Sequence, residues 1–286
     1  MASRHSPSAL GEFIKSRRYR LQPEEAGIIT SFPGRRRTPG LRREEVAYIA
    51  NVSVTYYTWL EQGRERNPSP EILFHISQAL QLNEDEREHL FNLAARESVG
   101  IATAPRPKKN VPGFFQSLVD QLRYPSFISN EFADMIVWNR AAELVVADFG
   151  RLPENERNMV TLLFLDPEYP SRLVNWEDFA RYMTALIRAS FELFKDNPLY
   201  VERFEHLKRS SAEFVRLWER HEIRQKSTVP VHYRLTDGQE LEFTVHSAAA
   251  IDNDPGLHLC FLVPAPGSGT EEQLALLLAQ DAELSP

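Results

Sequence analysis

The chain has 286 residues, 42% of them hydrophobic and 26% charged, with 17 Phe and 4 Trp among them. This length predicts two domains, and the aromatic content excludes a chain that is disordered throughout. The single cysteine, Cys260, excludes an internal disulfide and a multi-cysteine metal site. With no long apolar run and no signal peptide, the sequence predicts a cytoplasmic protein that does not enter a membrane.

The net charge of −7 is unevenly distributed along the chain. Residues 1–43 carry ten basic and three acidic side chains, whereas residues 44–100 carry four and ten, and residues 101–286 carry 19 and 27. A basic segment in an otherwise acidic protein is typical of a DNA-binding module joined to a second domain.

The first predicted helix covers residues 8–21, "SALGEFIKSRRYRL". Leu10, Phe13 and Ile14 have helical spacing behind a Ser N-cap, so they are expected in a core. The basic side chains of this helix are predicted to point outward: Lys15, Arg17, Arg18 and Arg20. A loop rich in Gly and Pro follows and carries three consecutive arginines, Arg35 to Arg37.

Four short helices are predicted next, in "RREEVAYIA", "SVTYYTWLEQG", "SPEILFHISQALQL" and "NEDEREHLFNLAAR". Ser53 and Ser69 are expected N-caps, Pro70 fits the first helical position, and Gly63 fits a helix stop. With the first helix they predict an all-α domain over residues 1–97, followed by a linker over 98–110, where Pro, Lys and Gly replace the apolar period.

Residues 43–62 have the parts of a helix-turn-helix, which needs a tight turn between a supporting helix and a DNA-reading helix. Ala47 is small where the helices would cross, and Asn51 tolerates the left-handed turn conformation that Gly usually fills. Val52, Tyr57 and Leu60 are predicted to face the core. Ser53, Thr55, Tyr56 and Thr58 are then predicted to face the DNA groove, with Tyr56 alternatively packing on the sugar-phosphate edge.

Arginines beside such a motif are candidate phosphate contacts, which supply affinity without reading sequence, although solvated surface arginines are the alternative. The complete set of predicted DNA-contacting residues is Arg17, Arg35, Arg36, Arg37, Arg42, Arg43, Ser53, Thr55, Tyr56, Thr58, Arg64 and Asn67.

The second domain is predicted over residues 111–265, with a tail over 266–286 that ends in a short helix. Two strands and a turn lead to Trp138, helices fill 158–223, and two or three strands close the domain around the turns "DGQE" and "NDPG". This order predicts an α+β domain with an antiparallel sheet. The sequence shows no internal repeat.

The second domain is rich in large aromatic residues, which line ligand cavities but also fill ordinary cores. The residues predicted to line a cavity are Phe127, Phe132, Ile136, Trp138, Phe164, Phe179, Met183, Ile187 and Trp218. Arg188 or His221 is expected to pair with a carboxylate on the ligand, because a buried unpaired carboxylate is too costly.

No catalytic residue and no metal site is predicted. No two histidines have the i, i+4 spacing of a zinc hydrolase, and neither G-x-S-x-G nor a phosphate-binding loop occurs. His232, His246 and His258 fall on the closing strands, where side chains facing solvent are expected rather than a metal cluster.

Residues 8–96 resemble lambda-repressor-like helix-turn-helix domains of the xenobiotic-response-element type. The strings "RRRTPGLRREEVA", "VSVTYYTWLEQGRERNPSPEIL" and "DEREHLFNLA" are similar to MmyB-like bacterial regulators, and "WNRAAE", "LLFLDP" and "SAEFVRLWERHEI" resemble the same family's second domain. The resemblance implies a PAS-like domain that binds a fatty acid or similar small apolar effector, a homodimer on palindromic operator DNA, and a connection to antibiotic metabolism.

The sequence leaves two other functions open for residues 111–265. They could form only a dimerisation platform with a filled core, or an enzymatic domain fused to the helix-turn-helix. The expected function is a ligand-responsive, sequence-specific transcriptional regulator that is not an enzyme and needs no cofactor.

Overall fold

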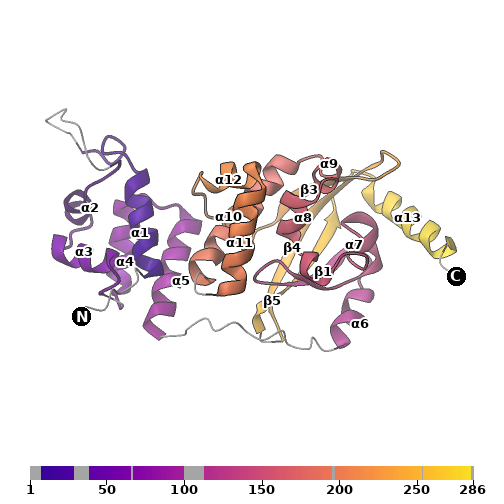
Figure 1. Cartoon of the computed structure of the whole chain (residues 1–286), viewed down its shortest axis with the longest axis horizontal. Coiled ribbons are helices and arrows are strands. Elements are labelled where there is room, and N and C mark those ends of the chain that lie inside the picture. Colours follow the sequence, from indigo (N-terminus) through magenta and orange to yellow (C-terminus); the bar gives the residue numbers. More distant parts are fainter. Residues whose placement is uncertain are drawn as a thin grey trace. The chain divides into compact units, whose positions relative to one another are not determined.

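A computed structural model describes residues 8–28, 39–65, 67–99, 113–194, 197–252 and 254–284. The chain divides near residue 104 into two compact units (Figure 1). The first unit is helical in its described residues, and the second combines helices with an antiparallel sheet. The predicted fold class, a helical domain followed by an α+β domain, is confirmed.

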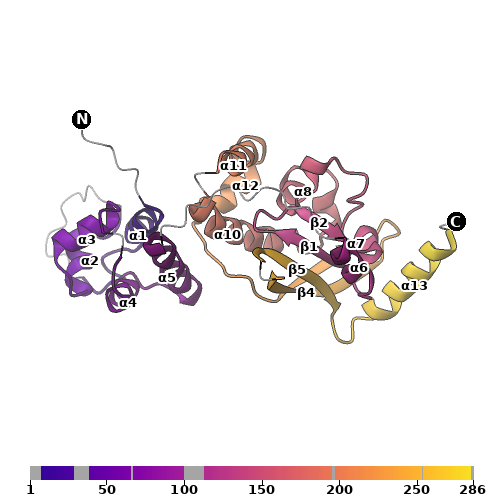
Figure 2. The same cartoon turned by 90° about the horizontal axis from the view of Figure 1, so that it is seen from below.

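The described helices of the first unit are α1 (Ala9–Arg20), α2 (Arg43–Ile49), α3 (Val54–Glu61), α4 (Pro70–Ala79) and α5 (Glu84–Val99) (Figure 2). The predicted caps are present: the hydroxyls of Ser8, Ser53 and Ser69 each accept a backbone N–H three residues ahead. Each such bond satisfies one of the donors that a helix start leaves open.

The core of the first unit contains buried apolar residues from each of these helices. Leu10, Phe13 and Ile14 of α1 are buried as predicted. Gly63 ends α3 with a φ of +66°, and a β-carbon there would come within 2.8 Å of the Ser8 side chain. Gly63 is therefore required both by its backbone conformation and by close packing.

The described strands of the second unit form one five-stranded antiparallel sheet in the order β2-β1-β5-β4-β3. They are β1 (Ser126–Asn130), β2 (Met135–Trp138), β3 (Val229–Arg234), β4 (Glu240–Ile251) and β5 (Asp254–Pro264). The predicted strands on both sides of the helical stretch are therefore present. The register of β1 on β2 shifts between Ile128 and Ser129, which leaves Ile136 as an extra residue in β2.

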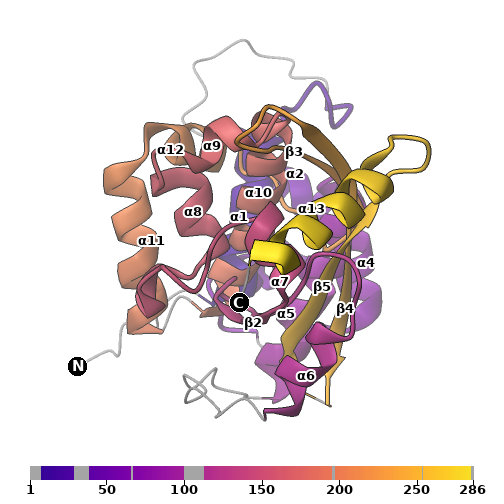
Figure 3. The ribbon, with the colours of Figure 1, turned by 90° about the vertical axis from the view of Figure 1, so that its right-hand side faces the viewer.

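Helices fill the chain between β2 and β3, as the sequence predicts. They are α7 (Arg140–Val145), the 3-10 turn η1 (Glu154–Glu156), α8 (Met159–Leu165), α9 (Tyr169–Arg172), α10 (Trp176–Phe194), α11 (Pro198–Ser210) and α12 (Ala212–Trp218). Figure 3 shows α8, α9, α11 and α12 together on one side of the sheet. The expected terminal helix is α13 (Thr270–Leu284), which packs against β4.

The sheet carries an apolar cluster on each side. We call the side that packs against α8 and α10 the inner face; its core includes Phe127, Val231, Tyr233, Phe243, Cys260 and Leu262. On the outer side, Ile128 of β1 packs against Phe115 and Val119 of α6 (Phe114–Asp120). Successive residues of β1, Phe127 and Ile128, therefore enter different clusters, as the two-residue period of a strand requires.

Candidate nucleic-acid interface and ligand site

The turn between α2 and α3 has the geometry of a helix-turn-helix. Asn51 adopts the left-handed conformation with a φ of 55°, and Ala47, at the predicted crossing, is 1% exposed. The next amide, that of Val52, donates to the carbonyl oxygen of Ala47 at 3.0 Å. This closes α2 and lets α3 begin at Val54 after its Ser53 cap.

Helix α3 divides into a buried and an open face. Tyr57 and Leu60 are both 0% exposed, as predicted. Ser53 and Thr55 are exposed, whereas Tyr56, Thr58 and the preceding Val52 are half-buried. The predicted groove-facing residues thus all retain access to solvent, with Tyr56 at the margin.

Sequence reasoning missed two members of the open face. Val54 is 41% and Trp59 46% exposed, and their helical positions flank Thr55 and Thr58. In α2, Tyr48 is 87% exposed. Apolar residues are usually assigned to the core, so hydropathy alone conceals them. The signal that could have found them is the angle around α3, since 100° per residue places 54, 55, 58 and 59 on one side.

The predicted phosphate contacts fall into two groups. Arg35, Arg36 and Arg37 lie outside the described residues. Arg42 is exposed at the start of α2, where its backbone N–H donates to Glu45 Oε2 at 2.6 Å. Arg64 and Asn67 are exposed just beyond α3.

The prediction that Arg17 and Arg18 point outward is wrong. Arg17 is 2% exposed and its Nη1 lies 3.4 Å from Glu86 Oε1, while Arg18 is 3% exposed and bonds Glu61 Oε1 through Nε at 2.5 Å. Helix α1 lies at the centre of the unit, so carboxylates from α3 and α5 neutralise its arginines. Arg17 therefore belongs to the interior of the unit and not to its exposed basic surface.

Glu61 is the centre of a buried ion cluster. Its side chain accepts from Arg18 and, through Oε2, from Arg43 Nε at 2.6 Å, and Arg18 Nη1 also donates to the Leu41 carbonyl oxygen at 2.8 Å. Burial and then the charge of Glu61 raise the pKa of Tyr57 well above its usual value. Arg43, predicted to contact phosphate, thus also joins α2 to the end of α3.

A second ion pair cluster forms around Glu86 of α5. Arg20 donates to both of its carboxylate oxygens, at 2.7 and 3.0 Å, beside Arg17. Burial would raise the pKa of Glu86, but pairing with Arg20 and the charge of Arg17 outweigh it and leave that pKa below its ordinary value.

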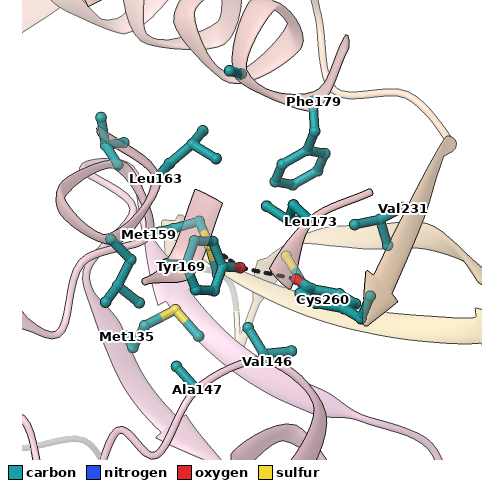
Figure 4. Close-up of a cluster of buried hydrophobic side chains, with 14 of the residues drawn as sticks. Met135, Val146, Ala147, Met159, Leu163, Tyr169, Leu173, Phe179, Val231 and Cys260 are labelled. Carbon is teal, nitrogen blue, oxygen red and sulfur yellow. Dashed lines mark hydrogen bonds between the residues drawn. The ribbon is translucent and has the colours of Figure 1, made fainter. Parts of the chain in front are cut away.

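In the second unit, the inner face supports a dense apolar cluster. Figure 4 shows Met159 and Leu163 of α8, Phe179 of α10 and Val231 and Cys260 of the sheet converging on it. At its centre the hydroxyls of Tyr169 and Tyr233 are 2.9 Å apart. Burial raises the pKa of Tyr233 to about 12. Both hydroxyls are neutral near pH 7; one donates to the other, and the Tyr169 O–H also lies 3.5 Å from Met159 Sδ, which can accept from it.

Most of the predicted cavity residues reach this cluster. Phe127, Phe164 and Phe179 are buried within it, and Trp138, Met183, Ile187 and Trp218 are half-buried against it. Phe132 instead stacks on Tyr200, with ring centroids 4.8 Å apart, and Ile136 is the extra residue of the β2 bulge. The aromatic stripe of α10 is therefore turned toward the apolar cluster, where Phe191 also contacts Phe204 of α11, and its spacing predicts such a buried side.

The two candidates for pairing with a carboxylate differ in position. Arg188 is buried; its guanidinium carbon lies 3.8 Å from the Trp218 ring centroid, and its Nη2 donates to the Trp218 carbonyl oxygen. His221 is exposed in a left-handed conformation beyond α12, because it terminates that helix. His221 therefore lies at the surface and not in the apolar cluster, and its pairing with a ligand carboxylate stays a prediction.

The strand histidines do not share one environment. His232 and His246 project to the outer side, where His246 stacks on Phe261 with centroids 5.6 Å apart. His258 lies on the inner face beside Cys260, and burial lowers its pKa to about 4. His258 is half-buried like the other two, but its Nδ1 is buried, so the expected solvent-facing side chain is only partly present there. In the described part of the chain, no group of three potential metal ligands comes together, and no helix there is long and apolar enough to span a membrane.

Comparisons with known proteins match both units. Residues 111–277 match the model of the MmyB-like transcription regulator ligand binding domain, and residues 9–90 match a helix-turn-helix domain. No curated protein matches. A solved structure, "Structure of an RNA-binding Light-Oxygen-Voltage Receptor", is similar over 84% of this chain at 12% identity and a TM-score of 0.24, and this chain spans 57% of its length.

The first of these two family models covers more than half of the chain, and the second covers the unit that carries the α2–α3 turn. The chain therefore belongs to the MmyB-like transcription regulators, with an N-terminal helix-turn-helix domain and a C-terminal ligand-binding domain.

Proposed function

We propose that the protein is a homodimeric regulator that binds a palindromic operator through the open face of α3 and responds to a fatty-acid-like ligand on the inner face of its sheet. The observation that carries this proposal is the open face itself. Thr55, Thr58 and Trp59 project from a short helix held rigidly by Tyr57, Leu60 and the Glu61 ion cluster, with exposed Arg42 and Arg64 at its flanks.

Such a face fits the major groove, where hydroxyls contact base edges and apolar groups contact the thymine methyl. A dimer would place two such helices about one helical turn of DNA apart, so the operator would be a palindrome. The arginines would supply phosphate contacts and hence affinity that falls with salt.

For the ligand, the supporting observation is the inner face. Half-buried Met183, Ile187 and Trp218 pack against it from helices that belong to the family's ligand-binding domain. A PAS-like sensor that binds an apolar chain between sheet and helices fits this arrangement. The ligand would act by binding one arrangement of the dimer better than the other, since equal affinity for both would shift nothing.

The test combines two measurements on the full chain. Organic extracts of the folded, purified protein are analysed by mass spectrometry, and gel shifts on operators selected from random DNA are run with and without the species found. A stoichiometric single-chain lipid that changes the shift supports the proposal. DNA binding by a protein that carries no lipid and ignores added fatty acid would leave the second domain as a dimerisation platform.

A further inference from the structure

One end of the inner face differs from the rest, because its residues on β4 are exposed. Ser247 and Ala249 of β4 project to the same side as buried Phe243, yet both are exposed. In the register of the sheet, His258 lies between Ser129 on one neighbouring strand and Ala249 on the other. His258 itself is half-buried between these small side chains.

His258 has an unsatisfied polar atom at this end. Its Nδ1 is buried and has no hydrogen-bond partner among the described residues. Burial keeps the ring neutral near pH 7, so one ring nitrogen can donate a hydrogen bond. Buried polar atoms in native proteins almost always have a partner, and an exception calls for a group that the folded chain itself does not supply.

Lys226 supplies a positive charge beside this ring. The backbone next to Lys226 is held by two hydrogen bonds between Ser227 and Tyr182 of α10. The Tyr182 hydroxyl donates to the Ser227 carbonyl oxygen at 3.1 Å and accepts from the Ser227 N–H at 3.0 Å. The ammonium of Lys226 is close enough to His258 to lower the pKa of that imidazole.

Lys226 is exposed over part of its side chain and forms no ion pair with the residues that the structure describes. Desolvation lowers its pKa, and the nearby Cys260 and Glu131 only partly oppose this. The charge thus lies at the border between solvent and the apolar cluster, where an anion would stabilise it.

We propose that Lys226 and His258 bind the anionic head group of a single-chain amphiphile, whose apolar chain lies along the inner face toward Cys260 and Phe179. This inference rests on the proposed function and specifies its ligand class. It differs from pairing through Arg188, whose guanidinium is already engaged with Trp218. A charge-assisted bond at Lys226 supplies selectivity for the head group, and chain burial supplies affinity.

The experiment measures dissociation constants of dodecanoate, dodecyl phosphate and dodecanol for the full chain by isothermal titration calorimetry. The three probes share one apolar chain and differ in head group. Wild-type protein is expected to bind an anionic probe about tenfold or more tightly than dodecanol. The relative affinities of carboxylate and phosphate then separate a free fatty acid from a lipid phosphate as the source of the head group.

Lys226→Met is expected to weaken binding of the two anionic probes by about tenfold and to leave binding of dodecanol unchanged. Lys226→Glu should bind the cationic probe dodecylammonium more tightly than the anionic probes. His258→Phe removes the imidazole donor and should weaken binding of the anionic probes less than Lys226→Met does. Lys208→Met is the matched control, because Lys208 pairs with Glu205 on the surface of α11.

Retention of the full anion preference by Lys226→Met and Lys226→Glu, with tight binding of the chain, overturns the head-group assignment but not the sensor. Failure of wild-type protein to bind any of the three probes overturns the proposed ligand class and this inference together.

Discussion

Arg43, the first residue of α2, donates its Nε–H to Oε2 of Glu61, the last residue of α3, at 2.6 Å. The same carboxylate holds Arg18 of α1, and its side chain is 0% exposed. One buried charge therefore ties together three helices and fixes where the open face of α3 lies.

Replacing this carboxylate should loosen the first unit. Glu61→Gln leaves the Arg18 guanidinium buried without a counter-charge, which typically costs about 3 kcal/mol or more. We expect hydrogen exchange, followed by mass spectrometry of peptides from α1 and α3, to become faster by a corresponding factor. Arg43→Met is the milder control, since its side chain is 39% exposed and exposed pairs contribute about 1 kcal/mol or less. Unchanged protection in Glu61→Gln would contradict the central role of this cluster.

Glu86 should make the first unit sensitive to acid. Its folded pKa lies below the ordinary 4.5, so its ionised form stabilises the fold above about pH 4.5, and that contribution is lost as the pH falls through the folded pKa. Glu86→Gln should therefore reduce amide protection in α1 and α5 at pH 7, and the difference from wild type should shrink toward about pH 3. Glu88→Gln, an exposed neighbour on α5, should change little at either pH. If the difference in protection between the two proteins grew on acidification, the folded pKa of Glu86 would be raised and not lowered.

The local elements could be predicted from the sequence because caps, stops and apolar periods are local signals. Ser53, Asn51 and Gly63 each act within a few residues, and the structure confirms all three. The buried arginines of α1 could not be predicted in this way. Whether Arg17 faces solvent depends on Glu86, which lies far along the chain, and no spacing rule relates the two residues.

The proposed ligand site also has one part that local sequence signals predict and one part that depends on distant residues. The stripe on α10 is periodic, so its inward direction could be predicted, but the position of His258 depends on pairing of β5 between β1 and β4. A shift of one residue in that register would move the imidazole to the other side of the sheet. Strand composition contains no signal strong enough to choose between the two registers.

Phosphate and base contacts should separate by their salt dependence. Arg42→Ala should weaken binding to operator and random DNA alike and reduce the slope of log K against log salt by about 0.9, because one phosphate contact is lost. Thr55→Ala should leave the slope unchanged and relax the preference at particular base pairs. Fluorescence anisotropy at several salt concentrations measures both, with exposed Arg151→Ala of the second unit as the control. Equal slopes and equal loss of preference in both variants would contradict the assigned face.

Trp59 should contribute to DNA binding far more than to stability. Its side chain is 46% exposed, so Trp59→Ala is expected to leave protection in α3 nearly unchanged. Loss of a large apolar contact in the groove should nevertheless weaken operator binding by about tenfold. Tyr48→Ala, at an exposed position of α2, tests whether any exposed aromatic residue has this effect. If Trp59→Ala destabilises α3 without changing the affinity of the folded protein for DNA, then Trp59 has a packing role only.

Asn139 should be the most sensitive polar residue of the second unit. Its Nδ2 donates to the carbonyl oxygens of Val119, Leu122 and Tyr124 at 3.3, 2.9 and 2.8 Å, and its Oδ1 accepts from the amides of Ser126 and Ala142. One side chain thus joins α6, β1 and α7. Asn139→Asp replaces the donor with a carboxylate that faces three carbonyl oxygens, at an expected cost of about 3 kcal/mol near pH 7.

Protonation would return one O–H donor to this position, so the folded pKa of the new carboxyl group should be raised. A raised folded pKa means that the penalty relative to wild type shrinks as the pH falls through that value. Thermal unfolding of the two proteins at pH 7 and at about pH 5 measures the change in the difference. Asn139→Ala lacks a titrating group, so its deficit should stay constant between the two pH values. A deficit of Asn139→Asp that is independent of pH would show that the side chain leaves this hydrogen-bonded position when substituted.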